Sequence, residues 1–114
     1  MNKEKTIKKN HHFKWIIKKG KKSNKKTVRV FITHNKDNKN KLGIAIRKNI
    51  KNAVLRNRVK RVIREIYRLE ENKLRKYFNI IICFNTETVN FNEIYIDIKN
   101  AFYDLNMYKE KGNI

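Results

Sequence analysis

The sequence predicts one domain of the α/β class, in which a sheet packs against helices. Three observations indicate this class. Two short segments, residues 27–33 and 42–47, alternate apolar and polar side chains with the period of a β-strand. A long amphipathic segment, residues 52–76, leads into a continuous apolar run at residues 79–84, which is the pattern of a parallel strand–helix–strand crossover. The length of 114 residues allows a single domain and hardly more.

The first predicted element is a helix over residues 7–19. Its apolar side chains recur at helical spacing, and Gly20 is a favourable residue just beyond a helix end. A short extended piece at residues 15–18 is the alternative. The lysine-rich segment that follows, residues 21–26, is expected to be a solvated loop.

Two strands come next. In residues 27–33 the aliphatic side chains fall on one face, and Arg29 and Phe31 fall on the other. In residues 42–47 the aliphatic side chains again share one face, opposite small residues and an arginine. Because polar turn residues, 34–41, join the two strands, we expect the strands to pair as a hairpin with a long loop.

The longest helix is predicted over residues 52–76, with Asn52 as its N-cap. One stripe of this helix is apolar and is expected to face the core. It consists of Leu55, Val59, Val62, Ile63, Ile66 and Leu69. A second stripe is polar or basic and faces elsewhere, and it consists of Asn57, Lys60, Arg61, Arg64 and Arg68.

The last two elements are a central buried strand at residues 79–84, predicted from its continuous apolar run, and a helix over residues 91–107. Asn90 with Glu93 three residues later resembles a capping box, which marks the start of the helix. The helix carries an apolar stripe that is expected to face the core. Its members are Phe91, Ile94, Tyr95, Ile98, Phe102 and Leu105.

The net charge of +20 is distributed unevenly along the chain. Residues 1–64 hold 23 Lys or Arg and 2 Asp or Glu, a net charge of +21. Residues 65–114 hold 7 Lys or Arg and 8 Asp or Glu, a net charge of −1. Five of the eight arginines fall within residues 56–68. Arginine grips phosphate with a planar fork and stacks on bases, so this cluster predicts a nucleic-acid partner. An ordinary solvated amphipathic helix is the alternative.

Composition also excludes several classes of site. A single cysteine, Cys83, excludes an internal disulfide and cysteine-rich zinc sites. No apolar run is long enough to span a membrane and no secretory signal is evident, so we expect a cytoplasmic protein. The three histidines lack partners at ligand spacing, so no metal site is expected in the protein. Without a catalytic triad or a carboxylate pair, we expect no catalytic residue in the protein either.

A second candidate surface is the face of the strands that carries Arg29 and Phe31. An aromatic ring can stack on a base while an arginine contacts phosphate, which is how single-stranded nucleic acid is commonly held. A sheet face covered by a helix is the alternative. On the sequence alone, Phe13 and Ile17, four residues apart on the first helix, are better explained by core packing.

Residues 41–68, KLGIAIRKNIKNAVLRNRVKRVIREIYR, strongly resemble the bacterial ribonuclease P protein component. That family has a glycine-containing strand, a lysine-bearing turn and then an Asn-Ala-Val-x-Arg-Asn-Arg-x-Lys-Arg motif that opens a long helix. The resemblance covers roughly residues 7–108, between a basic N-terminal tail, 1–6, and a C-terminal tail, 109–114. The motif residues here are Asn52, Ala53, Val54, Arg56, Asn57, Arg58, Lys60 and Arg61.

The resemblance implies a two-layer α/β sandwich of order αβββαβα, with an unusual left-handed crossover at the arginine motif. It also implies a protein that joins a catalytic RNA in removing the 5′ leader of precursor tRNA, the RNA doing the chemistry with magnesium ions. The implied partners are this RNA and the leader, with no membrane and no obligate protein partner. A general RNA-binding or ribosomal protein is the main alternative, and a self-sufficient nuclease is the second.

Residue roles transfer only where positions match. The resemblance assigns RNA binding to Lys48, Asn52, Arg56, Asn57, Arg58, Lys60, Arg61, Arg64 and Arg68. It assigns a leader cleft to Phe13 and Phe31. Ile17 stands where an aromatic residue is frequent, and Arg29 joins the cleft from strand alternation alone.

The turn before the motif departs from the family pattern. Asn49 and Lys51 replace family residues there, and Lys51 stands where the family usually has glycine. Glycine is needed at such a position only if the backbone adopts a positive φ. The structure of the turn therefore decides whether this departure matters.

Overall fold

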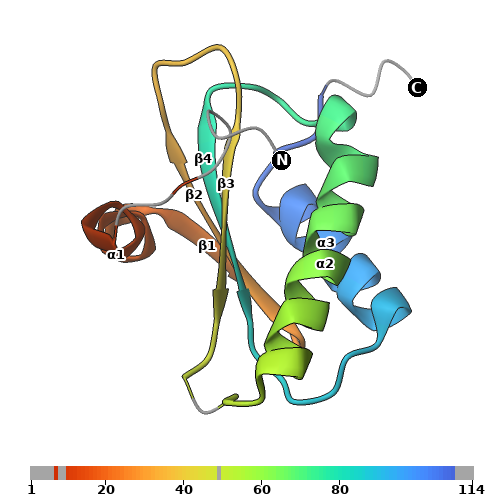
Figure 1. Cartoon of the computed structure of the whole chain (residues 1–114). Coiled ribbons are helices and arrows are strands. Elements are labelled where there is room, and N and C mark those ends of the chain that lie inside the picture. Colours follow the sequence, from red (N-terminus) through yellow and green to blue (C-terminus); the bar gives the residue numbers. More distant parts are fainter. Residues whose placement is uncertain (1–6, 8–9, 49, 110–114) are drawn as a thin grey trace.

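A four-stranded sheet lies between one helix on one face and two helices on the other (Figure 1). The computed structural model describes residue 7 and residues 10–48 and 50–109. The order αβββαβα expected from the family is confirmed. The elements are α1 (Asn10–Lys19), β1 (Lys21–Asn24), β2 (Val28–His34), β3 (Lys41–Ile46), α2 (Ala53–Glu70), the short 3-10 helix η2 (Glu71–Lys73), β4 (Phe78–Phe84) and α3 (Phe91–Asp104).

The strand order in the sheet is β1-β2-β4-β3. β4 is central, antiparallel to β2 and parallel to β3. The predicted hairpin between residues 27–33 and 42–47 is therefore wrong, because β4 lies between those two strands. β4 is buried along nearly its whole length, on both faces of the sheet. The continuous apolar run predicts a central strand, and the sheet order confirms this, but the run does not show which strands flank it.

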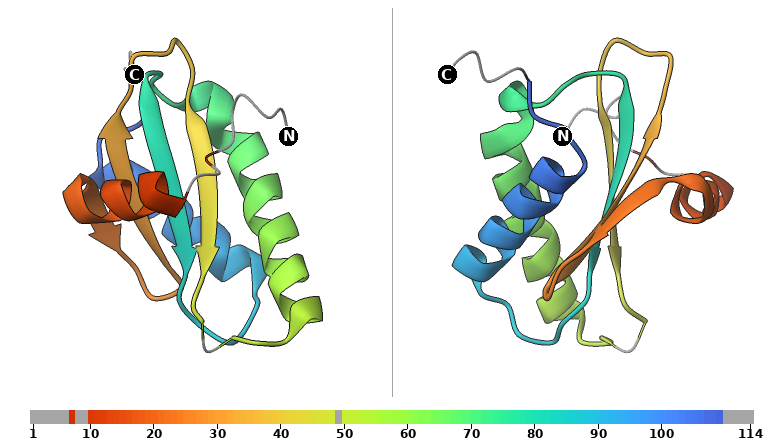
Figure 2. Two further views of the ribbon diagram at one scale, coloured as in Figure 1. Left: turned by 60° about the vertical axis from the view of Figure 1, so that its left-hand side comes forward. Right: turned by 180° about the vertical axis from the view of Figure 1, so that it is seen from behind.

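The connection β3–α2–β4 is the predicted parallel crossover, and it is left-handed. In the left view of Figure 2, β3 and β4 both run downward, α2 returns behind the sheet, and the chain moves leftward from β3 to β4. The family resemblance implies this hand. General packing principles favour the opposite one by a wide margin, so the pattern of elements alone would predict it wrongly.

Residues 21–26 are not the solvated loop that their lysines predict. Lys21–Asn24 form the edge strand β1, antiparallel to β2. Ser23 is buried, and its hydroxyl donates to Asp104 Oδ2 at 3.0 Å, an oxygen that also lies 2.6 Å from Lys25 Nζ. Backbone pairing and polar contacts hold this strand, so it leaves no apolar alternation in the sequence. Lysines on an edge strand also discourage pairing with other chains.

The main core lies between the sheet and helices α2 and α3. Val59, Ile63 and Ile66 of α2 are fully buried there, as the apolar stripe predicts. Two members of the predicted stripes are exposed instead. Leu69 of α2 is 41% exposed and Phe91 of α3 is 39% exposed. Leu69 lies in the same turn as Tyr67 and Glu70, which are buried in its place, and Phe91 is the first residue of α3.

The last turn of α2 buries a carboxylate, Glu70, in place of the predicted Leu69. Its two oxygens accept hydrogen bonds from the hydroxyls of Tyr95, at 2.7 Å, and Tyr108, at 2.8 Å. Burial alone would raise the pKa of Glu70, but these hydroxyl donors and the nearby Lys73 ammonium outweigh it and hold the pKa below its ordinary value. Glu70 therefore stays ionised and ties α2 to α3 and to the chain that follows α3.

Two predicted helices end earlier than expected. α2 ends at Glu70 rather than at residue 76, because Leu74 turns into the core and forms an antiparallel bridge with Tyr108. α3 ends at Asp104 rather than at residue 107. Asn106 there adopts the left-handed conformation, with a φ of 57°, that commonly terminates helices.

α1 lies over the other face of the sheet, where Ile7 joins its small core (Figure 2). It is helical over Asn10–Lys19, so the extended alternative at residues 15–18 is wrong. The predicted end at Gly20 is confirmed, and its backbone N–H donates to the Ile16 carbonyl at 2.7 Å. A Cβ at Gly20 would lie 2.6 Å from the carbonyl oxygens of both Ile16 and Ile32. Glycine is therefore required by the close approach of α1 to β2.

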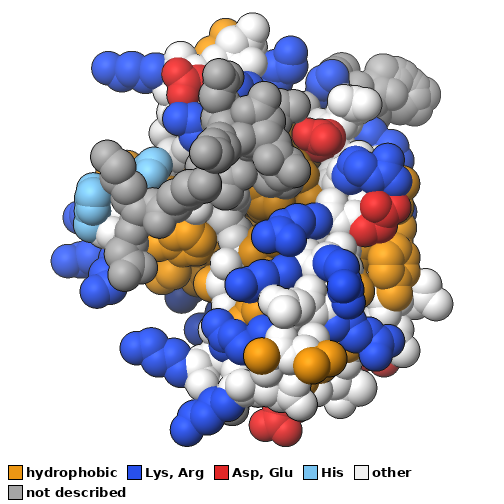
Figure 3. All heavy atoms as spheres, in the orientation of Figure 1, with side chains coloured by type: hydrophobic (Ala, Val, Ile, Leu, Met, Phe, Trp, Pro, Cys, Tyr) orange, Lys and Arg blue, Asp and Glu red, His pale blue; other side chains and the backbone are white. Residues whose placement is uncertain are grey.

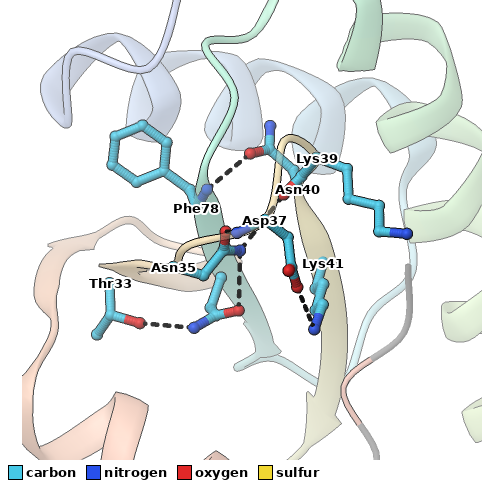
Figure 4. A network of polar contacts seen from close by, with 8 residues as sticks. Thr33, Asn35, Asp37, Lys39, Asn40, Lys41 and Phe78 are labelled. Atoms are coloured by element: carbon cyan, nitrogen blue, oxygen red, sulfur yellow. Dashed lines mark hydrogen bonds and ion pairs between the residues drawn. The ribbon is translucent and has the colours of Figure 1, made fainter. Parts of the chain in front are cut away.

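A polar network anchors the β2–β3 loop to the start of β4 (Figure 4). The buried Asn79 donates to Thr33 Oγ1 at 3.1 Å and accepts from Asn35 Nδ2 at 3.2 Å. Asn40 Oδ1 accepts from the backbone N–H of Phe78 at 2.9 Å. These bonds fix the end of β2 and the start of β4 relative to each other.

Candidate nucleic-acid interface

The packing of α2 decides which of its basic residues reach the surface. Since Val59, Ile63 and Ile66 point into the core, residues half a turn away point outward. Lys60 is half-buried at the edge of this outward face of α2. Figure 3 shows Lys and Arg side chains gathered over this helix. The exposed residues of this face, called the arginine face below, are Asn57, Arg58, Arg61, Arg64 and Arg68.

The start of α2 is fixed by Asn52, whose Oδ1 accepts a hydrogen bond from the Leu55 backbone N–H at 3.1 Å. The predicted N-cap is confirmed, so this side chain has a structural task at the position that the family assigns to RNA binding. Lys51 has no positive φ, and glycine is therefore not needed there. Asn49 lies outside the described residues.

Arg56 differs from the other arginines of the motif because it is half-buried. Its Nη1 donates to the carbonyl oxygens of Ile50, at 2.8 Å, and Arg47, at 3.3 Å. It therefore holds the turn between β3 and α2 against the first turn of the helix. Lys48 lies exposed in this turn, beyond the end of β3. Arg56 thus positions the approach to the arginine face.

The arginines of the face differ in how free they are. The guanidinium groups of Arg58, Arg61 and Arg64 make no hydrogen bond or ion pair with any described residue. Arg68 is engaged by Glu65, with Nε 3.0 Å from Oε1 and Nη2 2.7 Å from Oε2. The guanidinium of Arg68 holds the pKa of Glu65 below its ordinary value. Three guanidinium groups are thus open to phosphate, and a fourth must first exchange its carboxylate.

The first predicted cleft residue, Phe13, lies over Gly43 of β3. A Cβ at Gly43 would lie 2.5 Å from Phe13 Cζ, so the missing side chain makes room for this ring. Phe13 is half-buried and packs on a small second core of Ile16, Phe31 and Ile81. The sequence shows Gly43 as one of the small residues of this face, but the pairing with Phe13 depends on the sheet order.

The remaining cleft residues separate into buried and exposed ones. Phe31 is only 5% exposed beneath α1, so its ring is covered in this structure, as the alternative of a helix-covered face expects. Ile17 is 39% exposed on α1. Arg29 is exposed in a cross-strand row with Cys83 and Ala45. Burial raises the pKa of the Cys83 thiol to about 11, against the opposing charge of Arg29, so the thiol is neutral.

Carboxylates are sparse near both surfaces. Within the described residues before Glu65, the single carboxylate is Asp37, whose Oδ2 lies 2.8 Å from Lys41 Nζ. No three His, Cys, Asp or Glu side chains gather at one place among residues 7, 10–48 and 50–109. In that same part of the chain, none of the helices has the length and apolar character needed to cross a membrane.

Comparison with known proteins points to one family. The ribonuclease P family model matches residues 1–106. The ribonuclease P protein component of Clostridium botulinum strain Langeland is 35% identical over 112 residues, which cover 96% of each chain. The solved Staphylococcus aureus RNase P protein superimposes with a TM-score of 0.82 at 28% identity, covering 92% of this chain and 98% of that one. The Thermotoga maritima RNase P protein gives a TM-score of 0.74 at 26% identity, covering 83% and 92%.

Proposed function

Because the chain belongs to the ribonuclease P protein family, we propose that its arginine face binds the RNA subunit and that its α1–sheet face binds the 5′ leader of precursor tRNA. The chain is the protein subunit of ribonuclease P, a tRNA-processing endoribonuclease, and its partner is the RNA of that enzyme. The subunit is accessory, because the RNA carries out the cleavage in this family. The assignment of the two faces is the proposal.

The observation that carries the first part is the set of three unpaired guanidinium groups on the arginine face. Arg58, Arg61 and Arg64 project from one rigid helix, without a described partner and without a carboxylate between them. Like charges held this close repel one another until an anion neutralises them. Arginine forks match phosphate geometry, so the sugar–phosphate backbone of a folded RNA is the natural ligand.

The second part rests on the strip of the sheet that α1 leaves open. Arg29 lies exposed there, and Ile17 is exposed on the flank of α1 that also carries Phe13. This combination offers a cation for phosphate and apolar surface for sugars and bases, which suits an unpaired strand. Ile17 and Phe13, rather than the buried Phe31, supply the apolar contact.

Magnesium is proposed to act in the RNA-containing holoenzyme, where RNA phosphates hold it. The protein's part is to place cations and apolar surface around the substrate, which lowers the repulsion between leader and RNA and improves metal binding by the RNA. A cytoplasmic location is proposed from the role in tRNA processing.

The test combines the protein with a ribonuclease P RNA and precursor tRNA at low magnesium concentration. We expect 5′ cleavage to be stimulated, and Arg61→Ala with Arg64→Ala to lose most of the stimulation, whereas Lys36→Ala in the exposed β2–β3 loop keeps it. No stimulation by the folded protein would refute the proposal and favour a general RNA-binding protein. Cleavage without added RNA would instead identify a self-sufficient nuclease.

The leader assignment is tested by comparing the affinity of the holoenzyme for precursor and mature tRNA. We expect Arg29→Ala to reduce the preference for the precursor while leaving the affinity for mature tRNA unchanged. An equal preference for precursor over mature tRNA in holoenzymes with the parent protein and with Arg29→Ala would show that the leader binds elsewhere.

A further inference from the structure

A hollow of about 600 Å³ opens on the other side of α1, where β2 ends and β4 begins. Segments that are distant in sequence meet there. They are the C-terminal half of α1, the first residue of β1, the last residues of β2, the chain that leads into β4, and the chain just after α3. The side chains that matter for its chemistry are Trp15, Lys19, Lys21, His34, Arg75 and Phe78.

This hollow is distinct from the α1–sheet face proposed to bind the leader, called the leader surface below, which consists of Phe13, Ile17 and Arg29. Ile16 points into the sheet, and successive helical residues are about 100° apart. Phe13 and Ile17 therefore lie on one flank of α1, and Trp15 and Lys19 lie on the opposite flank. Along β2, His34 is five residues from Arg29, or about 16 Å. A ligand in the hollow therefore uses none of the side chains assigned above.

The floor of the hollow is an ordered stack of flat groups. The rings of His34 and Phe78 lie with centroids 4.7 Å apart and an interplanar angle of 36°. The guanidinium carbon of Arg75 lies 5.7 Å from the Phe78 centroid, and its Nη1 donates to the Asn106 carbonyl at 3.0 Å. The polar network behind Phe78 fixes this floor. Its position is therefore set before any ligand arrives, which lowers the cost of binding.

The mouth of the hollow is aromatic and positively charged. Trp15 is 49% exposed at its edge, a large exposure for the one tryptophan of the chain. The side chains of Lys19 and Lys21 are exposed and make no hydrogen bond or ion pair with a described residue. Among the described residues that line the hollow, none is acidic. Aromatic surface beside unpaired cations fits a ligand that is both planar and anionic.

We propose that this hollow binds one nucleotide, with its base against Trp15 and its phosphate between Lys19 and Lys21. A volume of about 600 Å³ is sufficient for a base, a sugar and a phosphate. The shared chemistry is that of a nucleoside monophosphate, either free or as an unpaired residue within an RNA chain. The site goes beyond the proposed function, because it depends on neither the arginine face nor the leader surface.

The experiment uses the fluorescence of Trp15, which reports from the site itself because the chain has no other tryptophan. The full-length protein, without RNA subunit, is titrated with adenosine 5′-monophosphate, with a single-stranded trinucleotide and with inorganic phosphate. We expect saturable quenching by the nucleotide probes and none by phosphate alone. Lys19→Ala and Lys21→Ala should each weaken nucleotide binding by about tenfold, the effect of one lost charged contact.

Two variants serve as matched controls. Lys18→Ala removes a neighbouring α1 lysine outside the hollow, and Lys26→Ala removes an exposed lysine of the β1–β2 turn, so both should titrate like the parent protein. Equal affinity of the monophosphate and the trinucleotide supports a site for free nucleotides, whereas much tighter trinucleotide binding supports a site for unpaired RNA. Absence of quenching, quenching by phosphate alone, or equal weakening in Lys18→Ala and Lys19→Ala would overturn the proposal. Since no RNA subunit is present, each result is independent of the cleavage assay.

Discussion

Replacing Glu65 with glutamine should tighten the binding of the RNA subunit, although this residue carries no positive charge. Glu65 engages Arg68 through two hydrogen bonds, of 3.0 and 2.7 Å, at the end of the arginine face. Both side chains are exposed to solvent, so the pair contributes little to folding stability. Glutamine keeps the shape of the side chain and removes its charge, which releases Arg68 to contact a phosphate.

The magnitude follows from counterion release. Each phosphate contact contributes about 0.7–0.9 to the slope of log K against log salt, which corresponds to about fivefold to eightfold in affinity at ~0.1 M salt relative to 1 M. We expect Glu65→Gln to strengthen binding by about that factor and to steepen the slope by about one contact. Arg64→Ala should do the opposite by the same amount. Arg68→Ala should have a smaller effect than Arg64→Ala, because part of its charge is already compensated by Glu65.

The assay is the equilibrium binding of labelled ribonuclease P RNA over a series of salt concentrations, with thermal denaturation to check folding. Glu93→Gln, at the exposed start of α3, makes the same change in net charge away from the arginine face and serves as the control. If Glu65→Gln and Glu93→Gln strengthen binding equally, only long-range charge is at work. If Arg68→Ala weakens binding as much as Arg64→Ala does, the Glu65 pair does not restrain Arg68, and the reasoning is refuted.

Three further predictions concern the scaffold. Gly20→Ala should lower the free energy of unfolding by about 1–3 kcal/mol, because the added Cβ meets two backbone oxygens. Chemical denaturation measures this, with Lys18→Ala as the control. An unchanged denaturation midpoint in Gly20→Ala would contradict the prediction. Glu70→Gln should cost about 1–3 kcal/mol at neutral pH, because an amide cannot accept from both tyrosine hydroxyls as a carboxylate does. Folding lowers the pKa of Glu70, so the stability that its carboxylate contributes is complete above the ordinary pKa of 4.5 and is lost as the pH falls through the folded-state pKa. The difference in free energy of unfolding between the parent protein and Glu70→Gln should therefore shrink in acid. A difference that stays constant with pH would disprove the ionised role. Asn52→Ala should cost about 1 kcal/mol of stability with little change in RNA affinity of the folded protein, and a large affinity loss without destabilisation would make Asn52 an RNA contact instead of a cap.

Much of the arginine face could be predicted from sequence. Helical periodicity places Asn57, Arg61, Arg64 and Arg68 on one side because the buried positions recur every three or four residues. Periodicity does not distinguish a free guanidinium from one that is already bound. The family resemblance assigns Arg56 and Arg68 the same RNA-binding role as their neighbours. Only the contacts of Arg56 with carbonyl groups and of Arg68 with Glu65 show the difference.

The leader surface was predictable only in part, because its residues come from two elements, α1 and β2, whose packing the sequence does not show. Alternation along β2 places Arg29 and Phe31 on one face correctly. It cannot show that α1 covers one of them and leaves the other exposed. The contact of Phe13 with Gly43 depends on α1 crossing to β3, over a strand that comes later in the chain.

By itself, the sequence determined the fold class, the main helices, the strand that becomes central, the location of the charge and the family. These follow from local periodicity, capping residues and a specific motif, all of which act over a few neighbouring residues. The tertiary structure alone decided the place of β4 between β2 and β3, the edge strand β1, the burial of Phe31 and the hollow beside Trp15. Each of these depends on the packing of segments that are far apart in sequence, where backbone pairing and the volume under α1 set which side chains stay exposed.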